Sequence, residues 1–440
     1  MSTVIEARGS RARRVTASSA GAALESYEWS LYALLVTYFS PRFFGGDLRH
    51  SVLYGFGVFA VGFLIRPIGA LVLGRLADRR GRRPALVLSI GLAGVATLGM
   101  ALTPGRETLG AAAPVLLLVW RLVLGVSFGG EQAVAQAYLY ESAPPRRRML
   151  GTSVYSIFYG LGTITATLLV AGLATWAGPA VLRDGGWRIP FLVAAVLSLG
   201  FMVARRNIPE TLETLPEEED RPREWRGLLG PALAVAGLTA GCLASYYLWI
   251  SAPTSYGITV LRLPDAQVLW AGVVAQLAYM AAAPVCGALA DRVGPLRWVA
   301  GAAAVLAALT LPMQVLLNSA TPLTYWALMI VGSVGVVTLA ATVTGATAMV
   351  APARHRVTIM ALPYSITSAL FGGTTPALKQ KFASHPALFS LYIIALLLVT
   401  VLTALAARPL LADATTAGGP VSRGAGEGNG CDDGARGRTG

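Results

Sequence analysis

Twelve long apolar segments, each close to the length that crosses a lipid bilayer, dominate this chain of 440 residues. A helix needs about 20 mostly apolar residues to span the hydrocarbon core of a membrane. The segments lie at residues 21–40, 51–73, 84–103, 112–139, 149–176, 189–204, 227–250, 267–290, 295–316, 323–350, 357–378 and 386–407. They show no alternation of polar and apolar residues, and only helices satisfy their own backbone polar groups in lipid. We therefore predict an all-α polytopic membrane protein with twelve transmembrane helices.

Charged residues are few, and their placement is uneven. Only 13% of the residues are charged, whereas soluble domains carry about 25%, so a soluble globule is excluded. The net charge of +13 could indicate nucleic-acid binding, but most of the 35 lysine and arginine residues fall at the two termini and in every second loop. This distribution follows the positive-inside rule. We predict cytoplasmic termini, a location in the cell membrane and no nucleic-acid partner.

Two loop motifs recur in the second half of the chain. The pattern G-x-L-A-D-R-x-G occurs at residues 74–81 and 287–294, and A-P-x-R-x-R occurs at residues 143–148 and 351–356. The nearly equal offsets indicate two parallel six-helix repeats, which in transporters rock against each other around a central site. We predict bundles at 21–204 and 227–407. A cytoplasmic segment at 1–20, a polar linker at 205–226 and a disordered tail at 408–440 complete the chain.

Five ionisable residues interrupt the apolar segments, and all of them lie in the first half: Glu25, Glu28, Arg66, Arg121 and Glu131. Each costs about 2.5–3.5 kcal/mol at the centre of a membrane helix, so we expect them to be paired. Glu25 and Glu28 are three residues apart on one helix face, and Arg66 can pair with either. Two adjacent carboxylates cannot both ionise cheaply. We predict a proton-coupling site, with a structural ion network as the alternative.

Arg121 and a set of uncharged side chains are the candidate substrate contacts. A guanidinium that faces a central cavity can bind a carboxylate with two hydrogen bonds, although Arg121 could instead be a structural partner of Glu131. The predicted helices of the second half carry no charge, so neutral groups must contact the substrate there. The candidates are Tyr32, Tyr155, Tyr159, Tyr246, Tyr247, Trp249, Tyr256, Gln276, Tyr279 and Tyr364. Tyrosine and tryptophan also serve in helix packing and in interfacial belts, which is the alternative for each.

Several stretches of the sequence resemble a known transporter family. GRLADRRGRRP resembles the loop signature of the major facilitator superfamily. GAALESYEWSLY, VGFLIRPIGALVLGRLADRRGRRP, RLVLGVSFGGEQ, YLYESAPPRRR, YYLWISAPTSY and FGGTTP resemble its metabolite:proton symporter family, whose members carry shikimate, α-ketoglutarate, citrate or proline and betaine. The resemblance covers roughly residues 20–407. The family usually has an aromatic residue and an aspartate where this chain has Ser26 and Glu28.

The resemblance implies roles for residues outside the apolar segments. In the superfamily the loop aspartate docks at the end of a neighbouring helix and pairs with arginines, and this latch stabilises the outward-facing state. We therefore expect gating roles for Gly74, Asp78, Arg82 and Asp291, because a carboxylate is favoured at a helix N-terminus and beside guanidinium groups. The resemblance also implies that Arg121 acts in proton transfer or binding.

The buried charges and the resemblance together predict a secondary active transporter that takes up a small polar metabolite, a carboxylate or zwitterion, with protons. A proton-driven efflux antiporter stays open as an alternative, and a membrane sensor as a remote one. No predicted helix contains a histidine and the three cysteines are scattered, so we expect no enzyme, no metal site and no cofactor beyond the proton gradient. The expected partners are the substrate, protons and the bilayer, and the expected functional unit is a monomer.

Overall fold

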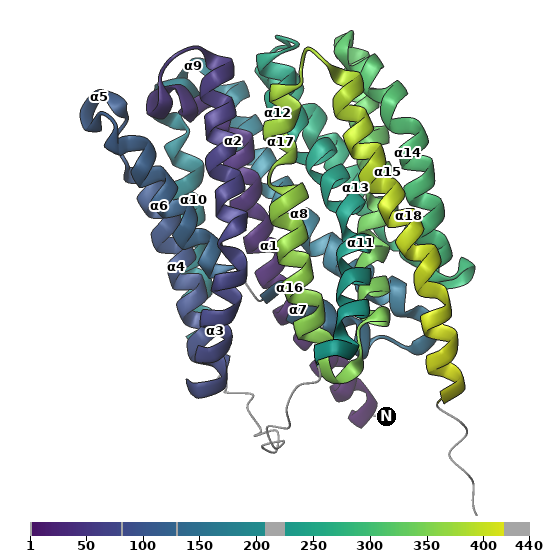
Figure 1. Cartoon of the computed structure of the whole chain (residues 1–440). Helices are drawn as coiled ribbons and strands as arrows, with labels where there is room; N and C mark the ends of the chain where they lie inside the picture. Colours follow the sequence, from purple (N-terminus) through teal and green to yellow (C-terminus); the bar gives the residue numbers. More distant parts are fainter. Residues whose placement is uncertain (1, 81, 129–130, 207–224, 418–440) are drawn as a thin grey trace, which may run out of the picture.

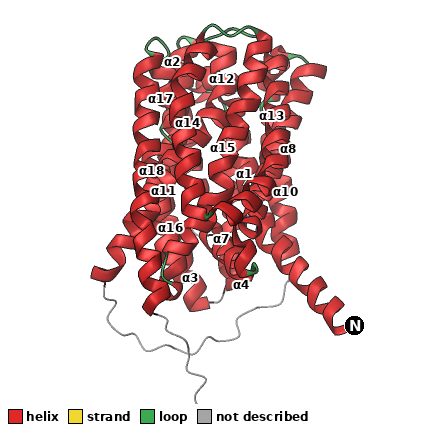
Figure 2. Cartoon of the chain, turned by 90° about the vertical axis from the view of Figure 1, so that its right-hand side faces the viewer, coloured by secondary structure: helices red, strands yellow, loops and turns green. Residues whose placement is uncertain are grey.

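The computed structural model describes residues 2–80, 82–128, 131–206 and 225–417. In this part of the chain the regular structure is helical, and the long helices run side by side in one bundle (Figure 1, Figure 2). The first and last described residues, Ser2 and Ala417, lie at the same end of the bundle (Figure 1). We call this end the termini end and the other end the opposite end. The prediction of an all-α protein is confirmed.

The first half contains six regions of long helix joined by short turns. Its helices are α1 (Ser2–Phe44), α2 (Leu48–Leu64), α3 (Arg66–Arg80), α4 (Arg82–Leu102), α5 (Arg106–Leu109), α6 (Ala112–Ser127), α7 (Glu131–Ser142), η1 (Pro145–Arg147), α8 (Arg148–Trp176), α9 (Pro179–Val181), η2 (Leu182–Gly186) and α10 (Arg188–Arg206). The apolar segment 112–139 thus comprises two helices, α6 and α7.

The second half repeats this arrangement, with two of its helices interrupted by π-helical turns. Its helices are η3 (Trp225–Leu228), α11 (Leu229–Tyr246), η4 (Tyr247–Ser251), α12 (Ala252–Thr259), α13 (Asp265–Val293), α14 (Pro295–Asn318), α15 (Pro322–Val350), η5 (Ala353–His355), α16 (Arg356–Thr367), η6 (Ser368–Gly372), α17 (Thr375–Lys381) and α18 (Pro386–Ala417). The π turns are η4 and η6. Such turns often occur at functional sites.

In the described residues, each apolar segment predicted from the sequence falls on one helix or on two or three consecutive helices. Within the described residues, eight helices are long and apolar enough to cross a membrane, or nine if the pair that bends by 63° at residues 179–203 is one span. Two further apolar helices, Val87–Leu102 and Ala112–Ser127, are shorter. The count of twelve spans and the cytoplasmic position of the termini stay predictions.

One predicted boundary is wrong. We expected a disordered tail from residue 408, but α18 continues without a break to Ala417. The sequence after residue 407 includes Leu410, Leu411 and several alanines, which are good helix formers, and Pro409 does not end the helix. Residues 418–440 lie outside the described part of the chain, as do residues 207–224 of the predicted linker.

Glycines bring the helices of the first half into close contact. Gly125 of α6 packs directly on the carbonyl of Gly62 in α2, and Gly162 of α8 packs on the carbonyl of Ala23 in α1. A side chain at either glycine would collide with the backbone of the neighbouring helix, so these residues permit the short interhelical distances. These contacts hold α2 close to α6 and α1 close to α8.

Candidate functional site

Glu25 and Arg66 form a buried ion pair between α1 and α3. The side chains are 3% and 5% exposed, and Arg66 Nη2 donates hydrogen bonds to Glu25 Oε1 and to the Phe128 carbonyl, the latter at 3.3 Å. The guanidinium carbon of Arg66 also lies 5.2 Å from the ring centroid of Trp29 and 5.5 Å from that of Phe63. The expected pairing of Arg66 with one of the two α1 carboxylates is therefore present, and its partner is Glu25.

Glu28 faces other helices than Glu25 does. Its carboxylate accepts hydrogen bonds from Thr97 Oγ1 of α4 at 2.6 Å and from Ser198 Oγ of α10 at 3.2 Å, and the residue is fully buried. Arg121 lies within electrostatic range. Each carboxylate thus has its own set of partners, so the close carboxylate pair that the helical spacing suggested is replaced by two separate sites.

Arg121 lies in a box of aromatic rings. It is 0% exposed, and its guanidinium carbon is 4.3 Å from the ring centroids of both Trp29 and Tyr32 and 5.2 Å from that of Phe59. Within the described part of the chain, none of its three guanidinium nitrogens has a hydrogen-bond partner. The rings offset part of the cost of burying the cation. Among the described residues, the five donors of this guanidinium thus have no acceptor.

The remaining predicted coupling and gating residues of the first half are only partly visible. Glu131 is the first residue of α7, Gly74 and Asp78 lie in α3, and Arg82 is the first residue of α4. Their side chains lie outside the described part of the structure. The suggested pairing of Arg121 with Glu131 and the latch around Asp78 therefore stay predictions.

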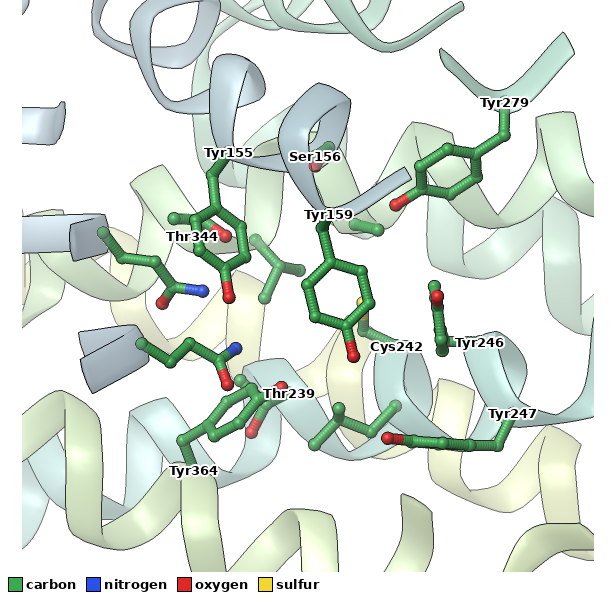
Figure 3. Close-up of a pocket in the computed structure, with 15 residues that line it drawn as sticks. Tyr155, Ser156, Tyr159, Thr239, Cys242, Tyr246, Tyr247, Tyr279, Thr344 and Tyr364 are labelled. Atoms are coloured by element: carbon green, nitrogen blue, oxygen red, sulfur yellow. The ribbon is translucent and has the colours of Figure 1, made fainter. Parts of the chain in front are cut away.

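A cavity of about 70 Å³ lies between helices of both halves (Figure 3). Six tyrosines from five helical elements surround it: Tyr155, Tyr159, Tyr246, Tyr247, Tyr279 and Tyr364. Its other lining residues are Gln132, Gln136, Ser156, Thr239, Cys242, Leu243, Ala340, Val343 and Thr344. No charged side chain is present among these residues. The cavity is therefore lined by polar hydroxyl and amide groups and by aromatic rings.

Most of the tyrosines that the sequence singled out reach this cavity. Of all the candidate substrate contacts, Tyr32, Trp249, Tyr256 and Gln276 do not line it. Tyr32 packs on Arg121 and donates a hydrogen bond to the Gly55 carbonyl at 2.9 Å. Tyr256 donates to Asn318, and Gln276 is buried beside the cavity without lining it. Small polar residues that line the cavity were not predicted, because a lone Thr, Ser or Gln in an apolar helix gives no indication of the direction it faces.

Phe63 connects the arginine box to the cavity. Its ring centroid is 3.9 Å from that of Trp29 and 5.5 Å from that of Tyr247, which lines the cavity. Phe59, which contacts Arg121, also lies 6.0 Å from Tyr247. A continuous set of buried rings therefore runs from the ionisable groups of the first half to the second half.

Ion pairs and hydrogen bonds join the two halves at the termini end. Asp291 of α13 accepts hydrogen bonds from the backbone N–H groups of Met149 and Leu150, at 2.9 and 3.0 Å, in the first turn of α8. Arg356 of α16 pairs with Glu141 of α7 at 2.5 Å. The carboxylate of Asp291 also complements the positive end of the α8 dipole. Asp291 is thus placed at a neighbouring helix end, as its predicted latch role requires.

Contacts of the same kind join the halves at the opposite end. Arg183 pairs with Asp265, the first residue of α13, at 2.8 Å. Trp270 of α13 donates to Thr175 of α8 at 3.0 Å. The two halves are therefore in contact at both ends of the bundle.

The second half contains a buried cation that the sequence analysis missed. Lys379 of α17 is 2% exposed, and its Nζ donates to Gln314 Oε1 at 2.5 Å and lies 4.1 Å from the ring centroid of Tyr256. The predicted apolar segment ends at residue 378, which leaves Lys379 in a loop. The helix instead continues to Lys381, so the statement that the second half has no buried charge is wrong.

The sequence is similar to a known protein family and to individual transporters. The profile of the Major Facilitator Superfamily matches residues 19–376. A citrate-proton symporter from Salmonella typhi is 32% identical over 373 residues, which are 82% of this chain and 85% of that protein. The alpha-ketoglutarate permease of Escherichia coli (strain K12) is 30% identical, with 89% and 92% covered. The proline/betaine transporter of the same organism is 30% identical, with 71% and 66% covered.

Solved structures show the same fold. The xylose transporter XylE from E. coli, in a partially occluded inward-open conformation, matches with a TM-score of 0.68 at 15% identity, over 89% of this chain and 95% of that chain. The XylE structure bound to 6-bromo-6-deoxy-D-glucose matches with a TM-score of 0.70, also at 15% identity, with 90% and 95% covered. At this identity the likeness establishes the helical fold alone.

Proposed function

Because the chain belongs to the major facilitator superfamily, whose members are multi-pass membrane transporters and not enzymes, we propose that it is a proton-coupled symporter. In this proposal it takes up a small polar metabolite, a carboxylate or zwitterion, by alternating access. Its termini end faces the cytoplasm, its bundles span the bilayer at 21–204 and 227–407 with twelve helices, and one copy suffices for transport. The relatives named above as a proton symporter of citrate and as transporters of other small metabolites support this function.

The observation that carries the proposal is the relation between Glu28 and Arg121. Glu28 is a fully buried carboxyl group whose two oxygens are contacted by neutral hydroxyls. Arg121 is a fully buried guanidinium without a hydrogen-bonded acceptor in the described residues. Buried ionisable groups in membrane proteins commonly mark proton or ion pathways. A buried carboxyl group that has no ion-pair partner, together with a buried guanidinium that has no acceptor in the described residues, is an arrangement that proton binding and release can switch.

The proton step follows from these two side chains. When Glu28 binds a proton on a carboxyl oxygen, it is neutral, and its O–H can donate to a hydroxyl neighbour. When it loses the proton, its carboxylate is attracted to the donors of Arg121, which favours a rearrangement of α1 against α6. Glu25 is less suited to this role, because Arg66 already neutralises it. Phe63 and Tyr247 are placed to transmit the rearrangement to the cavity.

The cavity and the contacts at its two ends suit alternating access. Substrate binds among the tyrosines between the halves, and each end opens when its layer of contacts breaks. Arg183–Asp265 and Thr175–Trp270 form the outer layer. Asp291 with the first turn of α8, and Glu141 with Arg356, form the cytoplasmic layer. Gly74, Asp78 and Arg82 add to that layer in this proposal.

The direct test uses purified protein in liposomes with an imposed pH gradient. The solutes are citrate, α-ketoglutarate, shikimate, proline and glycine betaine, which span the classes that the relatives carry. A symporter accumulates its substrate when the lumen is alkaline, by up to about tenfold per pH unit at one proton per substrate. Accumulation only with an acidic lumen would establish an antiporter, and so the efflux alternative.

The variant Glu28→Gln tests the proton carrier in the same assay. It keeps the size of the side chain and removes its titration, so we expect exchange of substrate at equilibrium to continue while gradient-driven accumulation is lost. Glu107→Gln is the matched control, because Glu107 is 82% exposed. Accumulation by Glu28→Gln at the level of the control would show that Glu28 does not carry the proton.

A further inference from the structure

The walls of the central cavity are made of aromatic rings that meet nearly at right angles. The ring of Tyr246 is 5.8 Å from that of Tyr159, 5.4 Å from that of Tyr247 and 6.4 Å from that of Tyr279, with interplanar angles of 77°, 79° and 80°. Figure 3 shows these rings on one side of the cavity, with Tyr155 and Tyr364 on the other. Perpendicular rings present faces from more than one direction to a group between them.

Faces of aromatic rings attract cations. A cation within about 6 Å of a ring centroid gains roughly 0.5–2 kcal/mol, and cages of several rings recognise quaternary ammonium groups in this way. Tyrosine faces are available here from five helical elements, α8, α11, η4, α13 and α16. No acidic side chain is among the described lining residues, so a cation would be held by ring faces and not by an ion pair.

The remaining polar groups suit a carboxylate. Gln132, Gln136, Thr239 and Thr344 line the cavity together with the tyrosine hydroxyls, and all but Thr239, which already donates to the Val235 carbonyl at 2.8 Å, can donate a hydrogen bond to a ligand. They come from α7, α11 and α15, so they lie on other elements than most of the rings. The cavity therefore offers both ring faces and hydrogen-bond donors to a single small ligand.

The charge balance around the cavity disfavours ligands with a large net charge. None of the described lining residues is charged. Of the two buried arginines nearby, Arg66 is paired with Glu25, and Arg121 is enclosed by the rings of Trp29, Tyr32 and Phe59 and does not line the cavity. Moving an uncompensated charge into such a site is costly, and the cost is greater for a dianion or trianion than for a single charge. A zwitterion brings no net charge, and its two ends match the two kinds of wall.

We propose that the tyrosine-lined cavity binds a zwitterion, with its ammonium group against the faces of Tyr159, Tyr246 and Tyr247 and its carboxylate on the hydroxyl and amide donors. This inference rests on the proposed transport function and narrows its substrate from a carboxylate or zwitterion to the zwitterion. Secondary and quaternary ammonium compounds fit best, because their alkyl groups spread the charge over a surface that matches the rings.

Two pairs of isosteric ligands test the charge requirement without any change in the protein. Glycine betaine is compared with 3,3-dimethylbutanoate, in which carbon replaces the ammonium nitrogen, and proline is compared with cyclopentanecarboxylate. Binding is measured as thermal stabilisation of the purified full chain and as inhibition of exchange, without a proton gradient. We expect at least one zwitterion to bind about tenfold or more tightly than the carboxylate in which carbon replaces its ammonium nitrogen.

Variants of Tyr246 test whether the rings supply the attraction. Tyr246→Phe keeps the ring face and should retain most of the affinity, whereas Tyr246→Leu removes it and should lower affinity for the zwitterion about three- to thirtyfold. The affinity for 3,3-dimethylbutanoate should change by a much smaller factor than this in both variants. Tyr54→Leu is the control, because Tyr54 is 57% exposed and lies outside the cavity.

Several outcomes would overturn the inference. These are equal affinity for both members of each pair, binding of citrate, α-ketoglutarate or shikimate in preference to the zwitterions, preference for an uncharged sugar, and no response to any zwitterion. Failure of the transport proposal would give a different result. A zwitterion would still bind selectively without a proton gradient, but its accumulation in liposomes would not depend on the pH gradient.

Discussion

Glu25 and Glu28 show how a difference of three residues directs two acids to different partners. Residues three apart on a helix differ by about 60° around its axis, so they share a face but do not point in the same direction. In the structure Glu25 reaches Arg66 of α3, and Glu28 reaches Thr97 and Ser198 of α4 and α10. The sequence predicted that both acids lie inside a membrane helix and that Arg66 pairs with one of them. Which of the two it is depends on the rotation of α1 within the bundle.

Two of the buried cations, Arg66 and Lys379, give a prediction at the residue scale. Arg66→Met leaves the buried carboxylate of Glu25 without its ion pair, which should cost about 3–5 kcal/mol of stability. Lys379→Met leaves only the amide oxygen of Gln314 unpaired and removes a cation that has no carboxylate within 4.0 Å in the described residues, so it should be neutral or stabilising. Thermal unfolding in detergent checks both.

The exposed variant Glu107→Gln gives the baseline for these measurements. Unfolding of Lys379→Met at a temperature as low as that of Arg66→Met would contradict this expectation. A stable Lys379→Met protein that no longer transports would instead show that the cation is retained for function.

At the scale of helices, close packing and not hydropathy decides how the elements meet. The sequence predicted the apolar segments, and all of them are helical. It did not predict the π turns η4 and η6 or the division of 112–139 into α6 and α7, because these depend on local backbone hydrogen bonds and on neighbouring helices. The end of α17 was misplaced by three residues, and this displaced Lys379 from the predicted buried set.

Substitution of Gly125 tests the close packing of α6 against α2. Gly125→Ala places a methyl group against the Gly62 carbonyl and the Ile65 side chain, so it should force α6 away from α2 and destabilise the protein by about 1–3 kcal/mol. Arg121 lies one turn earlier on α6, so substrate-driven proton uptake should also fall. Gly200→Ala is the control, since no atom lies within 4 Å of the added carbon there. Equal stability of the two variants would contradict the close-packing argument.

At the scale of the whole molecule, the two halves meet through contacts at both ends of the cavity. Cys242 lines that cavity, so its thiol can report which end is open. In a protein whose other two cysteines are replaced by serine, Asp265→Asn should weaken the outer layer and speed reaction of Cys242 with a charged thiol reagent added outside. Asp291→Asn should weaken the cytoplasmic layer and speed the reaction in inside-out vesicles.

The two variants act as controls for each other in this experiment. Each should change labelling from one side more than from the other. Equal acceleration from both sides would indicate general loosening of the bundle, and it would contradict the assignment of these contacts to separate ends.

The sequence by itself determined the class of protein: long apolar helices, two repeated halves, and a small set of buried charges that require partners. These features can be read from short stretches of sequence, because the free-energy cost of placing a residue in lipid depends mainly on that residue and its neighbours along the chain. Only the tertiary structure decided that Arg66 pairs with Glu25, that Arg121 is enclosed by aromatic rings, that Lys379 is buried and which tyrosines surround the cavity. Each of these depends on the rotation and register of one helix against another, which contacts such as Gly62 with Gly125 set and which no segment encodes alone.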